Sequence, residues 1–236
     1  MSKLTTYTLG DSAVTADLGP VISEALNNKV IAMNQWLLQN PFDGMKDLIL
    51  AYSSLTVYYD PFIIKKKYQP SLIHKWVEER MMEAYSNSPE SIGIEPVLHT
   101  IPVCYECEFG MDLQEMSHKK QITLEEIIDL HTSKTYRVYM IGFLPGFPYM
   151  GEVLPALAQP RKLKPMPVTA GSIGIAGAQT GIYPFNSPGG WNIIGRTPIS
   201  LFNPEKDLPV WLKPGDQVQF YGIGKDEFED IKETVK

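Results

Sequence analysis

Apolar and polar residues alternate over the first hundred residues in a pattern that predicts short strands. Leu4–Leu9 and Ala13–Leu18 flank a Gly-Asp turn, and Asp47–Tyr52 and Leu55–Tyr59 form a second pair of strand-like segments. Ile94–Tyr105 is extended and is interrupted by two prolines. These five segments predict a small sheet.

Two segments between these strands have helical periodicity instead. Ser23 is a candidate N-cap for a helix, and Ser71 is a candidate N-cap for another. Apolar residues follow each of them at spacings of three and four, at Leu26, Val30, Met33 and Leu37, and at Ile73, Trp76, Val77, Met81 and Ala84. The order β-β-α-β-β-α-β predicts an α+β domain of the split βαβ, ferredoxin-like kind over residues 1–100.

The pattern changes after about residue 100. A short helix is expected near Met111–Met116, and a second one from Thr123 to His131, where Thr123 and Glu126 have capping-box spacing. Most of the glycines and prolines follow Gly142. Short extended pieces lie between them, at 136–141, 193–194, 199–202 and 217–221. This punctuation favours a β-barrel or a β-sandwich over residues 101–236.

Composition excludes several classes of function. The formal net charge of −6 argues against nucleic acid as a partner, because phosphate binding needs a basic face. No apolar run approaches the roughly 18 residues of a membrane-spanning helix. The N-terminus lacks the apolar core of a signal peptide, and the two cysteines provide no disulfide framework. A cytoplasmic protein that does not act on membranes is therefore expected.

Short motifs that could carry chemistry are weak. Cys104 and Cys107 form a C-x-x-C in an extended stretch, where positions i and i+3 face opposite sides, so two free thiols and no metal site are expected. Ser172 lies in A-G-S-I-G, which departs from the nucleophile elbow at its first glycine. No phosphate-binding glycine loop is present, so no motif for binding ATP or another cofactor is found.

One stretch is unusual because it is almost free of charge. Arg196 is the only charged residue between Pro165 and Pro204. Around it lie uncharged hydrogen-bonding residues and one indole, at Gln179, Tyr183, Asn186, Ser187, Trp191 and Asn192. Two interpretations of Arg196 are open. It is either solvated or paired elsewhere in the fold, or its guanidinium binds a substrate carboxylate.

Two further features each allow two interpretations. Phe143, Phe147 and Tyr149 lie on the Gly/Pro-rich loop 142–151, where aromatic residues fit a pocket wall or a partner surface as well as a core. His131 lies at the predicted end of a helix. It either interacts favourably with the helix dipole or transfers protons as a general acid or base.

Several long motifs in the chain match those of a known family. They are P-V-C-Y-x-x-E-F-G-x-D-L (102–113), L-H-T-x-x-x-Y-R-V-Y-M-I-G-F-L-P-G-F-x-Y-M-G (130–151), A-G-S-I-G-I-A-G-x-Q-T-G-I-Y-P (170–184), S-P-G-G-W-x-I-I-G-R-T-P (187–198) and L-x-P-G-D-x-V-x-F (212–220). With them the chain resembles the KipI/PxpB family, whose members are also called allophanate hydrolase subunit 1 or the B subunit of 5-oxoprolinase. The resemblance covers nearly the whole chain.

The resemblance implies a fold and a set of functions. The second domain is expected to be a cyclophilin-like β-barrel. The chain is expected to act with a companion subunit of the allophanate hydrolase subunit 2 (PxpC) type and a lactamase-like PxpA-type subunit, in a complex that uses ATP to convert 5-oxoproline to glutamate. Two alternatives stay open, namely a KipI-like inhibitor of a sensor histidine kinase and a carboxyltransferase-type module of a urea carboxylase/allophanate pathway.

Side-chain chemistry then suggests roles in a cleft shared with the companion subunit. Arg196 is expected to hold a carboxylate and His131 to transfer protons. Gln179 and Tyr183 are expected to orient the lactam amide, and Trp191 with Phe147 is expected to form a wall of the site. The residues expected to bind the substrate are Phe147, Tyr149, Tyr183, Ser187 and Trp191.

Overall fold

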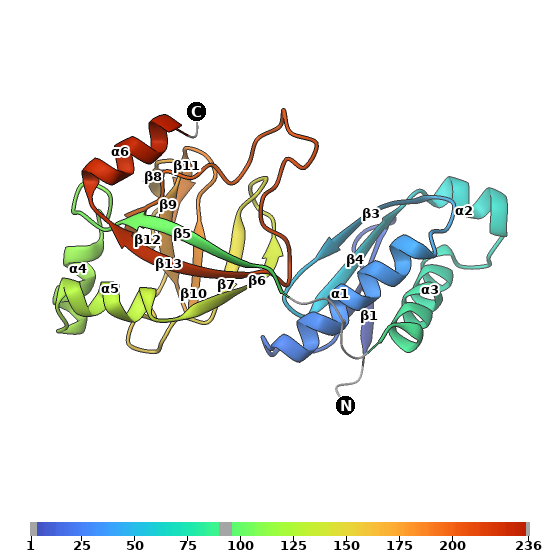
Figure 1. Cartoon of the computed structure of the whole chain (residues 1–236). Coiled ribbons are helices and arrows are strands. Elements are labelled where there is room, and N and C mark those ends of the chain that lie inside the picture. The colour runs from blue at the N-terminus through green and yellow to red at the C-terminus, as the bar shows by residue number, and fades with distance from the viewer. Residues whose placement is uncertain (1–3, 90–95, 235–236) are drawn as a thin grey trace. The chain divides into compact units, whose positions relative to one another are not determined.

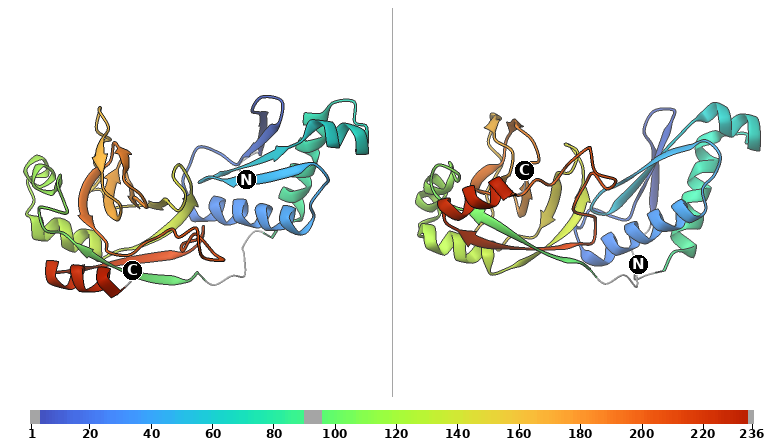
Figure 2. Two further views of the ribbon diagram at one scale, coloured as in Figure 1. Left: turned by 90° about the horizontal axis from the view of Figure 1, so that it is seen from above. Right: turned by 45° about the horizontal axis from the view of Figure 1, so that its top comes forward.

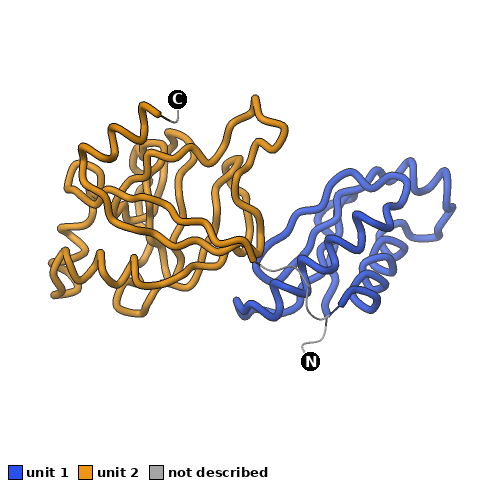
Figure 3. Tube along the Cα trace, in the orientation of Figure 1, with its two compact units in different colours: residues 1–95 blue, residues 96–236 orange. Residues whose placement is uncertain are grey.

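The computed structural model describes residues 4–89 and 96–234 and divides the chain into two compact units. Figure 3 shows them as residues 1–95 and 96–236. Strand β5 (Leu98–Cys104), which was expected in the N-terminal sheet, pairs with strands of the second unit. The second unit therefore begins ahead of the expected residue 101. Residues 94 and 95 of the predicted strand lie outside the described residues.

The first unit contains a four-stranded antiparallel sheet. Its strands are β1 (Thr5–Thr8), β2 (Ala13–Asp17), β3 (Met45–Leu50) and β4 (Ser54–Tyr59), in the order β1-β2-β4-β3. β2 and β3 both pair antiparallel with β4, which lies between them. The four strands that alternation predicted at the N-terminus are confirmed, and the fifth belongs to the other unit.

Helices cover one face of this sheet (Figures 1 and 2). α1 (Glu24–Gln39) packs against β3 and β4, and α3 (Ile73–Asn87) packs against β2 and α1. The hydroxyl of Ser23 accepts a hydrogen bond from the backbone N–H of Leu26, so the predicted N-cap of α1 is confirmed. The apolar stripe of each helix supplies the core of this unit.

Local capping explains two differences from the predicted helices. α2 (Pro61–Tyr68) was not predicted, although Asp60 caps it by accepting hydrogen bonds from the N–H groups of Phe62 and Ile63. The prediction that Ser71 caps α3 is wrong. The N-cap residue is Leu72, and among the described residues no side chain forms a cap hydrogen bond with this helix, so α3 depends on burial of its apolar stripe.

The second unit is built on a closed barrel of seven strands in the order β10-β7-β6-β13-β5-β12-β9 (Figure 1). The strands after β5 are β6 (Thr135–Ile141), β7 (Pro148–Gly151), β9 (Ser172–Ala176), β10 (Gln179–Ile182), β12 (Asn192–Arg196) and β13 (Gln217–Ile223). β13 pairs parallel with β5, and the other pairs are antiparallel. A separate pair, β8 (Met166–Val168) and β11 (Ser187–Gly189), lies outside the barrel order.

The strands β7, β9 and β10 are buried on both faces. Ile173 and Ile175 of β9 pack in the barrel core, whereas Ala176 of the same strand packs in a second cluster. Met150 likewise belongs to the barrel core, and Phe147 belongs to the second cluster. Because side chains alternate across a strand, the second cluster lies on the outer face of the barrel wall.

Three helices complete the second unit, with α4 (Leu113–Lys120) and α5 (Leu124–Thr132) side by side and α6 (Lys225–Thr234) against β5 (Figures 1 and 2). Thr123 and Glu126 form both hydrogen bonds of the predicted capping box. α6 was not predicted, and it is anchored by the buried ring of Phe228. Residues 199–202 form no strand, only one bridge from Phe202.

Both cysteines are free thiols, as expected, and only Cys107 is exposed. Burial raises the pKa of the Cys104 thiol. Within residues 4–89 and 96–234, no three His, Cys, Asp or Glu side chains gather in a way that could hold a metal ion. Over the same residues, no helix combines the length and apolar character needed to span a membrane.

Close packing across the barrel wall can be tested at one glycine. A Cβ at Gly181 would lie 2.8 Å from both the Phe147 ring and the carbonyl oxygen of Pro148. We expect Gly181→Ala to lower the free energy of unfolding by about 1–3 kcal/mol, because neither the buried ring nor the backbone can move freely. Chemical denaturation monitored by tryptophan fluorescence measures this.

Gly222 in β13 provides the matched control, because a Cβ there would meet nothing within 4 Å. Gly222→Ala should leave stability unchanged or raise it slightly. Equal stabilities of the two variants would contradict the close packing of Phe147 against the barrel wall.

Candidate functional site

A pocket of about 670 Å³ opens on the outer face of the barrel wall. Its lining comes from β7 and the loop before it, the β9–β10 turn and β10, the segment around 160–165, and the β11–β12 connection. These segments are far apart in sequence but belong to one unit. The volume lies within the range of small-molecule sites.

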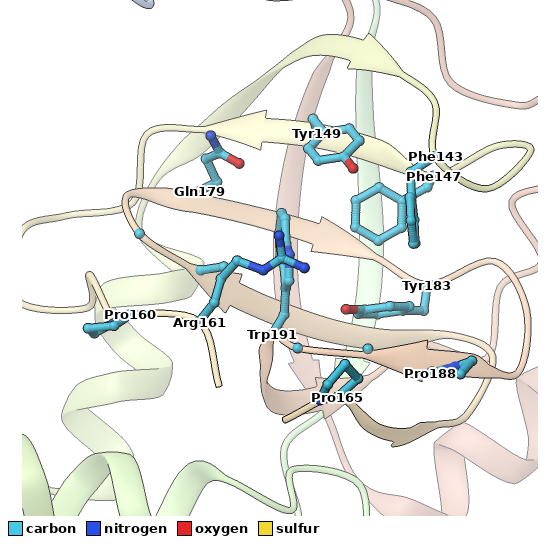
Figure 4. Close-up of a pocket in the computed structure, with 14 residues that line it drawn as sticks. Phe143, Phe147, Tyr149, Pro160, Arg161, Pro165, Gln179, Tyr183, Pro188 and Trp191 are labelled. Carbon is cyan, nitrogen blue, oxygen red and sulfur yellow. The ribbon is translucent and has the colours of Figure 1, made fainter. Parts of the chain in front are cut away.

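Four aromatic rings form one wall of the pocket (Figure 4). Phe147 is central, with ring centroids 4.8 Å from Tyr149, 5.1 Å from Tyr183 and 5.3 Å from Trp191. Its contacts with Tyr183 and Trp191 are edge-to-face, at 83° and 84°. Such mutual packing fixes each ring and presents a rigid apolar surface to the pocket.

Glycines in the charge-free stretch let these rings approach the backbone. A Cβ at Gly189 would lie 2.5 Å from the hydroxyl oxygen of Tyr183, and one at Gly174 would lie 2.9 Å from Cβ of Trp191. Either contact is too short for a real side chain, so an alanine would displace the ring. The glycines therefore allow the rings to pack against the backbone, which explains part of the high glycine content of this stretch.

Polar groups in the pocket are few and defined. Within the described residues, the Gln179 side-chain amide has no hydrogen-bond partner. Burial raises the pKa of the Tyr183 hydroxyl, while a hydrogen bond with the Trp191 backbone and the charge of Arg161 oppose the rise. Burial also raises the pKa of Tyr149, again opposed by Arg161. Both hydroxyls therefore stay protonated at neutral pH and can donate hydrogen bonds.

Sequence reasoning missed Arg161, whose side chain points into the pocket (Figure 4). It lies just before the charge-free stretch, in the basic run R-K-L-K at 161–164. The sequence signal that could have indicated Arg161 is this basic cluster, which directly precedes the charge-free stretch. Its proximity to Tyr183 and Trp191 depends on how the chain returns to the barrel wall, which the sequence does not show.

Arg196 lies in another part of the barrel. Its Nε donates a hydrogen bond of 2.8 Å to the carbonyl oxygen of Ala170, and its guanidinium lies 5.9 Å from the ring centroid of Phe228 in α6. Burial lowers the pKa of Arg196, and the charge of Glu229 opposes this shift. Arg196 does not line the pocket that contains Gln179 and Tyr183. Its surroundings are those of a structural arginine.

His131 lies inside the barrel, on the opposite face of the wall from the pocket. Its Nδ1 is 2.8 Å from the hydroxyl of Tyr105, its Nε2 is 3.2 Å from Oγ1 of Thr180, and its ring stacks on Phe220. Thr180 donates its own proton to the carbonyl of Gly174. Nε2 of His131 is therefore the donor to Thr180, and Nδ1 accepts from Tyr105.

Burial lowers the pKa of His131 to about 3, so the ring is neutral at physiological pH. Both ring nitrogens are engaged, and the side chain is fully buried. None of the residues that contact the imidazole, Tyr105, Thr180 and Phe220, lines the pocket. The geometry thus favours packing over proton transfer at this residue.

Ser187 lies on β11 opposite Val168. Its Oγ is buried without a hydrogen-bond partner among the described residues, and the next residue, Pro188, lines the pocket. The structure thus brings together Phe147, Tyr149, Gln179, Tyr183 and Trp191, and leaves His131, Ser187 and Arg196 outside the lining.

The environment of His131 predicts a pH-dependent stability. The unfolded histidine titrates near 6.5, whereas the folded one titrates near 3, so only the unfolded state takes up this proton as pH falls between these values. Stability is therefore fully present above pH 6.5 and declines below it, by about 1.4 kcal/mol per pH unit. Denaturation of wild type and His131→Gln between about pH 5 and pH 7.5 should show this extra slope in the wild type alone.

Identical slopes in the two proteins would contradict a neutral, buried imidazole. A loss of stability toward high pH would contradict it as well, because that sign belongs to a histidine that is charged in the folded state.

Comparison with known proteins identifies relatives over almost the whole chain. Residues 4–212 match the family model "Carboxyltransferase domain, subdomain C and D". The B subunit of 5-oxoprolinase from Bacillus subtilis (strain 168) is 41% identical over 95% of both chains. The proteins of the same name from Escherichia coli O157:H7 and Haemophilus influenzae are 36% and 38% identical, over 93% and 90% of this chain and 96% and 94% of their own lengths.

Solved structures agree with this relationship. The crystal structure of TTHA0988 is 33% identical over 94% of this chain, with a TM-score of 0.76, and this chain spans 40% of it. The K. lactis urea amidolyase superposes with a TM-score of 0.81 over 98% of this chain and 15% of its own, but at 17% identity it shows the fold alone. The chain belongs to the carboxyltransferase-domain family, subdomain C and D, together with the B subunits of bacterial 5-oxoprolinases.

Proposed function

We propose that this chain is the B subunit of a 5-oxoprolinase, acting in a complex that uses ATP to open 5-oxoproline to glutamate, and that it is inactive alone. Three relatives that carry the name of this subunit, matched along nearly their full lengths, support this. The observation that carries the proposal is the pocket itself. Five residues selected for their chemistry meet there, and they are Phe147, Tyr149, Gln179, Tyr183 and Trp191.

The pocket suits a small cyclic amide. A lactam ring is flat and largely apolar, and the aromatic wall around Phe147 offers rigid surfaces for it. The amide of Gln179 has a donor group for the lactam C=O and an acceptor for the lactam N–H. Ring opening develops charge on the carbonyl oxygen, and donors fixed around that oxygen lower the barrier. The protonated hydroxyls of Tyr149 and Tyr183 are candidates for this role.

The rim of the pocket supports action within a complex. Phe143 lines the pocket, but its side chain is 74% exposed. Its backbone φ of 62° lies in the left-handed region, which residues other than glycine rarely adopt. Leu163 in the 160–165 segment is fully exposed, and Met166, which follows this segment, is half exposed. Apolar residues around an open pocket are typical of a surface that a partner covers. We assign this cover to the companion PxpC-type subunit, with the PxpA-type subunit completing the complex.

The occurrence of this fold in longer chains is consistent with such a partner. This chain spans 40% of TTHA0988, so the relative carries a long additional segment in the same polypeptide. A covering subunit would exclude water from the pocket, and interactions between charges and dipoles inside it would become stronger. The sequence contains no recognisable phosphate-binding glycine motif, and we propose that ATP is bound by the assembled complex.

The two alternatives predict a different use of the same surface. A kinase inhibitor would need the apolar rim, but it would not need the side-chain amide of Gln179 in the pocket. A carboxyltransferase module would need a biotin carrier and a biotin carboxylase on other chains. The pocket contains the amide of Gln179, which has no hydrogen-bond partner in the described part of the chain, and this favours a small-molecule site.

Gln179 tests the small-molecule site. The chain should be assembled with its PxpA- and PxpC-type partners, and ATP-dependent release of glutamate from 5-oxoproline should be measured. We expect Gln179→Leu to lower kcat/KM by about 10-fold or more, because the lactam amide loses a hydrogen bond in a desolvated pocket. Gln114→Leu on α4, outside the pocket lining, is the control and should behave as wild type.

Absence of glutamate release from the wild-type complex would refute the proposed function. Equal activity of Gln179→Leu and wild type would be compatible with the proposed function but would contradict the role of this pocket in it.

The rim tests the partner surface. The double variant Phe143→Ser, Leu163→Ser should weaken co-purification with the PxpC-type subunit, because it replaces exposed apolar contacts with polar groups. Stability should change little, since both side chains are exposed. Leu38→Ser, at a 61% exposed leucine of α1 in the other unit, is the control. Undiminished co-purification of the double variant would place the partner elsewhere.

A further inference from the structure

We infer that Arg161, and not Arg196, binds the carboxylate of the substrate, so that the pocket selects a compact cyclic amide that carries one negative charge. This inference rests on the proposed function and specifies the ligand of the same pocket. It assigns separate tasks to separate groups. Arg161 binds the carboxylate, Gln179 forms hydrogen bonds with the amide, and the aromatic wall contacts the ring.

Backbone interactions fix the segment that carries Arg161. The backbone N–H of Lys162 donates to the carbonyl oxygen of Gly190 over 2.8 Å, and Nδ2 of Asn192 donates to the carbonyl oxygen of Pro160 over 2.9 Å. The residues on both sides of Arg161 are thus hydrogen-bonded to Gly190 and Asn192, the two neighbours of Trp191 in the chain. The arginine is held at the pocket although it belongs to no strand or helix.

The two neighbouring cations are used in different ways. Nζ of Lys162 lies 2.6 Å from the carboxylate of Asp112, which also accepts a hydrogen bond from the N–H of Ile193. Lys162 is therefore neutralised by a partly buried partner. Arg161 has no carboxylate partner and no hydrogen bond among the described residues. Lys162 holds the segment in place, and Arg161 presents to the pocket a guanidinium with no ion-pair partner among the residues that the structure describes.

The chemistry of the pocket wall favours an anion at Arg161. It is the only charged side chain among the described residues that line the pocket. A guanidinium offers parallel N–H donors that match a carboxylate in a bidentate arrangement. The hydroxyls of Tyr149 and Tyr183, close enough for the charge of Arg161 to act on them, add neutral donors. Within the described part of the chain, no acidic residue of the lining competes for the guanidinium.

The test uses the assembled complex with wild type, Arg161→Met, Arg161→Lys and Lys164→Met. Arg161→Met should raise KM for 5-oxoproline by roughly 10- to 100-fold, the loss expected for a charge-assisted hydrogen bond. Arg161→Lys should fall between, because it keeps the charge and loses the planar fork. Lys164→Met removes a nearby exposed charge outside this pocket and should leave KM unchanged.

A second ligand separates the carboxylate from the ring. 2-Pyrrolidinone is the same lactam without the carboxylate, and it should inhibit wild type and Arg161→Met equally. Assembly of each variant is followed by size-exclusion chromatography, and folding by thermal denaturation. Arg161 is exposed, so neither should change.

Three results would overturn the inference. KM for 5-oxoproline within about twofold of wild type in Arg161→Met would show that another group binds the carboxylate. An equal loss for 2-pyrrolidinone would show that Arg161 acts on the ring. Loss of assembly would show that Arg161 pairs with a carboxylate of a partner subunit. A wild-type complex that releases no glutamate would instead refute the proposed function, so the two failures are distinguishable.

Discussion

Burial of the barrel wall on both faces is the constraint on which the second unit depends. Along β9, Ile173 and Ile175 fill the barrel, while Gly174 and Ala176 face the outer aromatic cluster. A strand buried on both faces has no room for charge and little for bulk on its crowded side. This accounts for the charge-free, glycine-rich stretch without any reference to a ligand. The pocket then forms where the outer cluster is left open.

The same constraint separates two kinds of polar group. Thr180 faces inward and contacts His131 in the barrel, whereas its neighbour Gln179 faces the pocket. Adjacent residues of β10 thus face opposite sides of the wall, one in the hydrogen-bonded core network and the other in the pocket. The core network has its hydrogen-bond partners in place, whereas the half-buried amide of Gln179 has none among the described residues and can bind a ligand. The two residues have similar polarity in the sequence, and only their faces differ.

The binding site also depends on a segment that is irregular and held from outside. Lys162 pairs with Asp112 at the start of α4, and this ion pair fixes the approach of Arg161 to the barrel wall. An irregular segment can place a charged side chain at a pocket that strands must keep apolar. The proposed partner subunit would then close a site whose wall and cation are already in place.

By itself the sequence determined most elements and the family. Periodicity found α1 and the first four strands, and the capping box found α5, because these signals depend on neighbours within one or two turns. It also selected the aromatic and amide residues of the pocket. Only the tertiary structure decided that β5 joins the barrel, that Arg196 and His131 lie away from the pocket, and that Arg161 lies in it. Strand pairing and the face that a residue presents depend on contacts between residues far apart in the chain, and local patterns do not encode them.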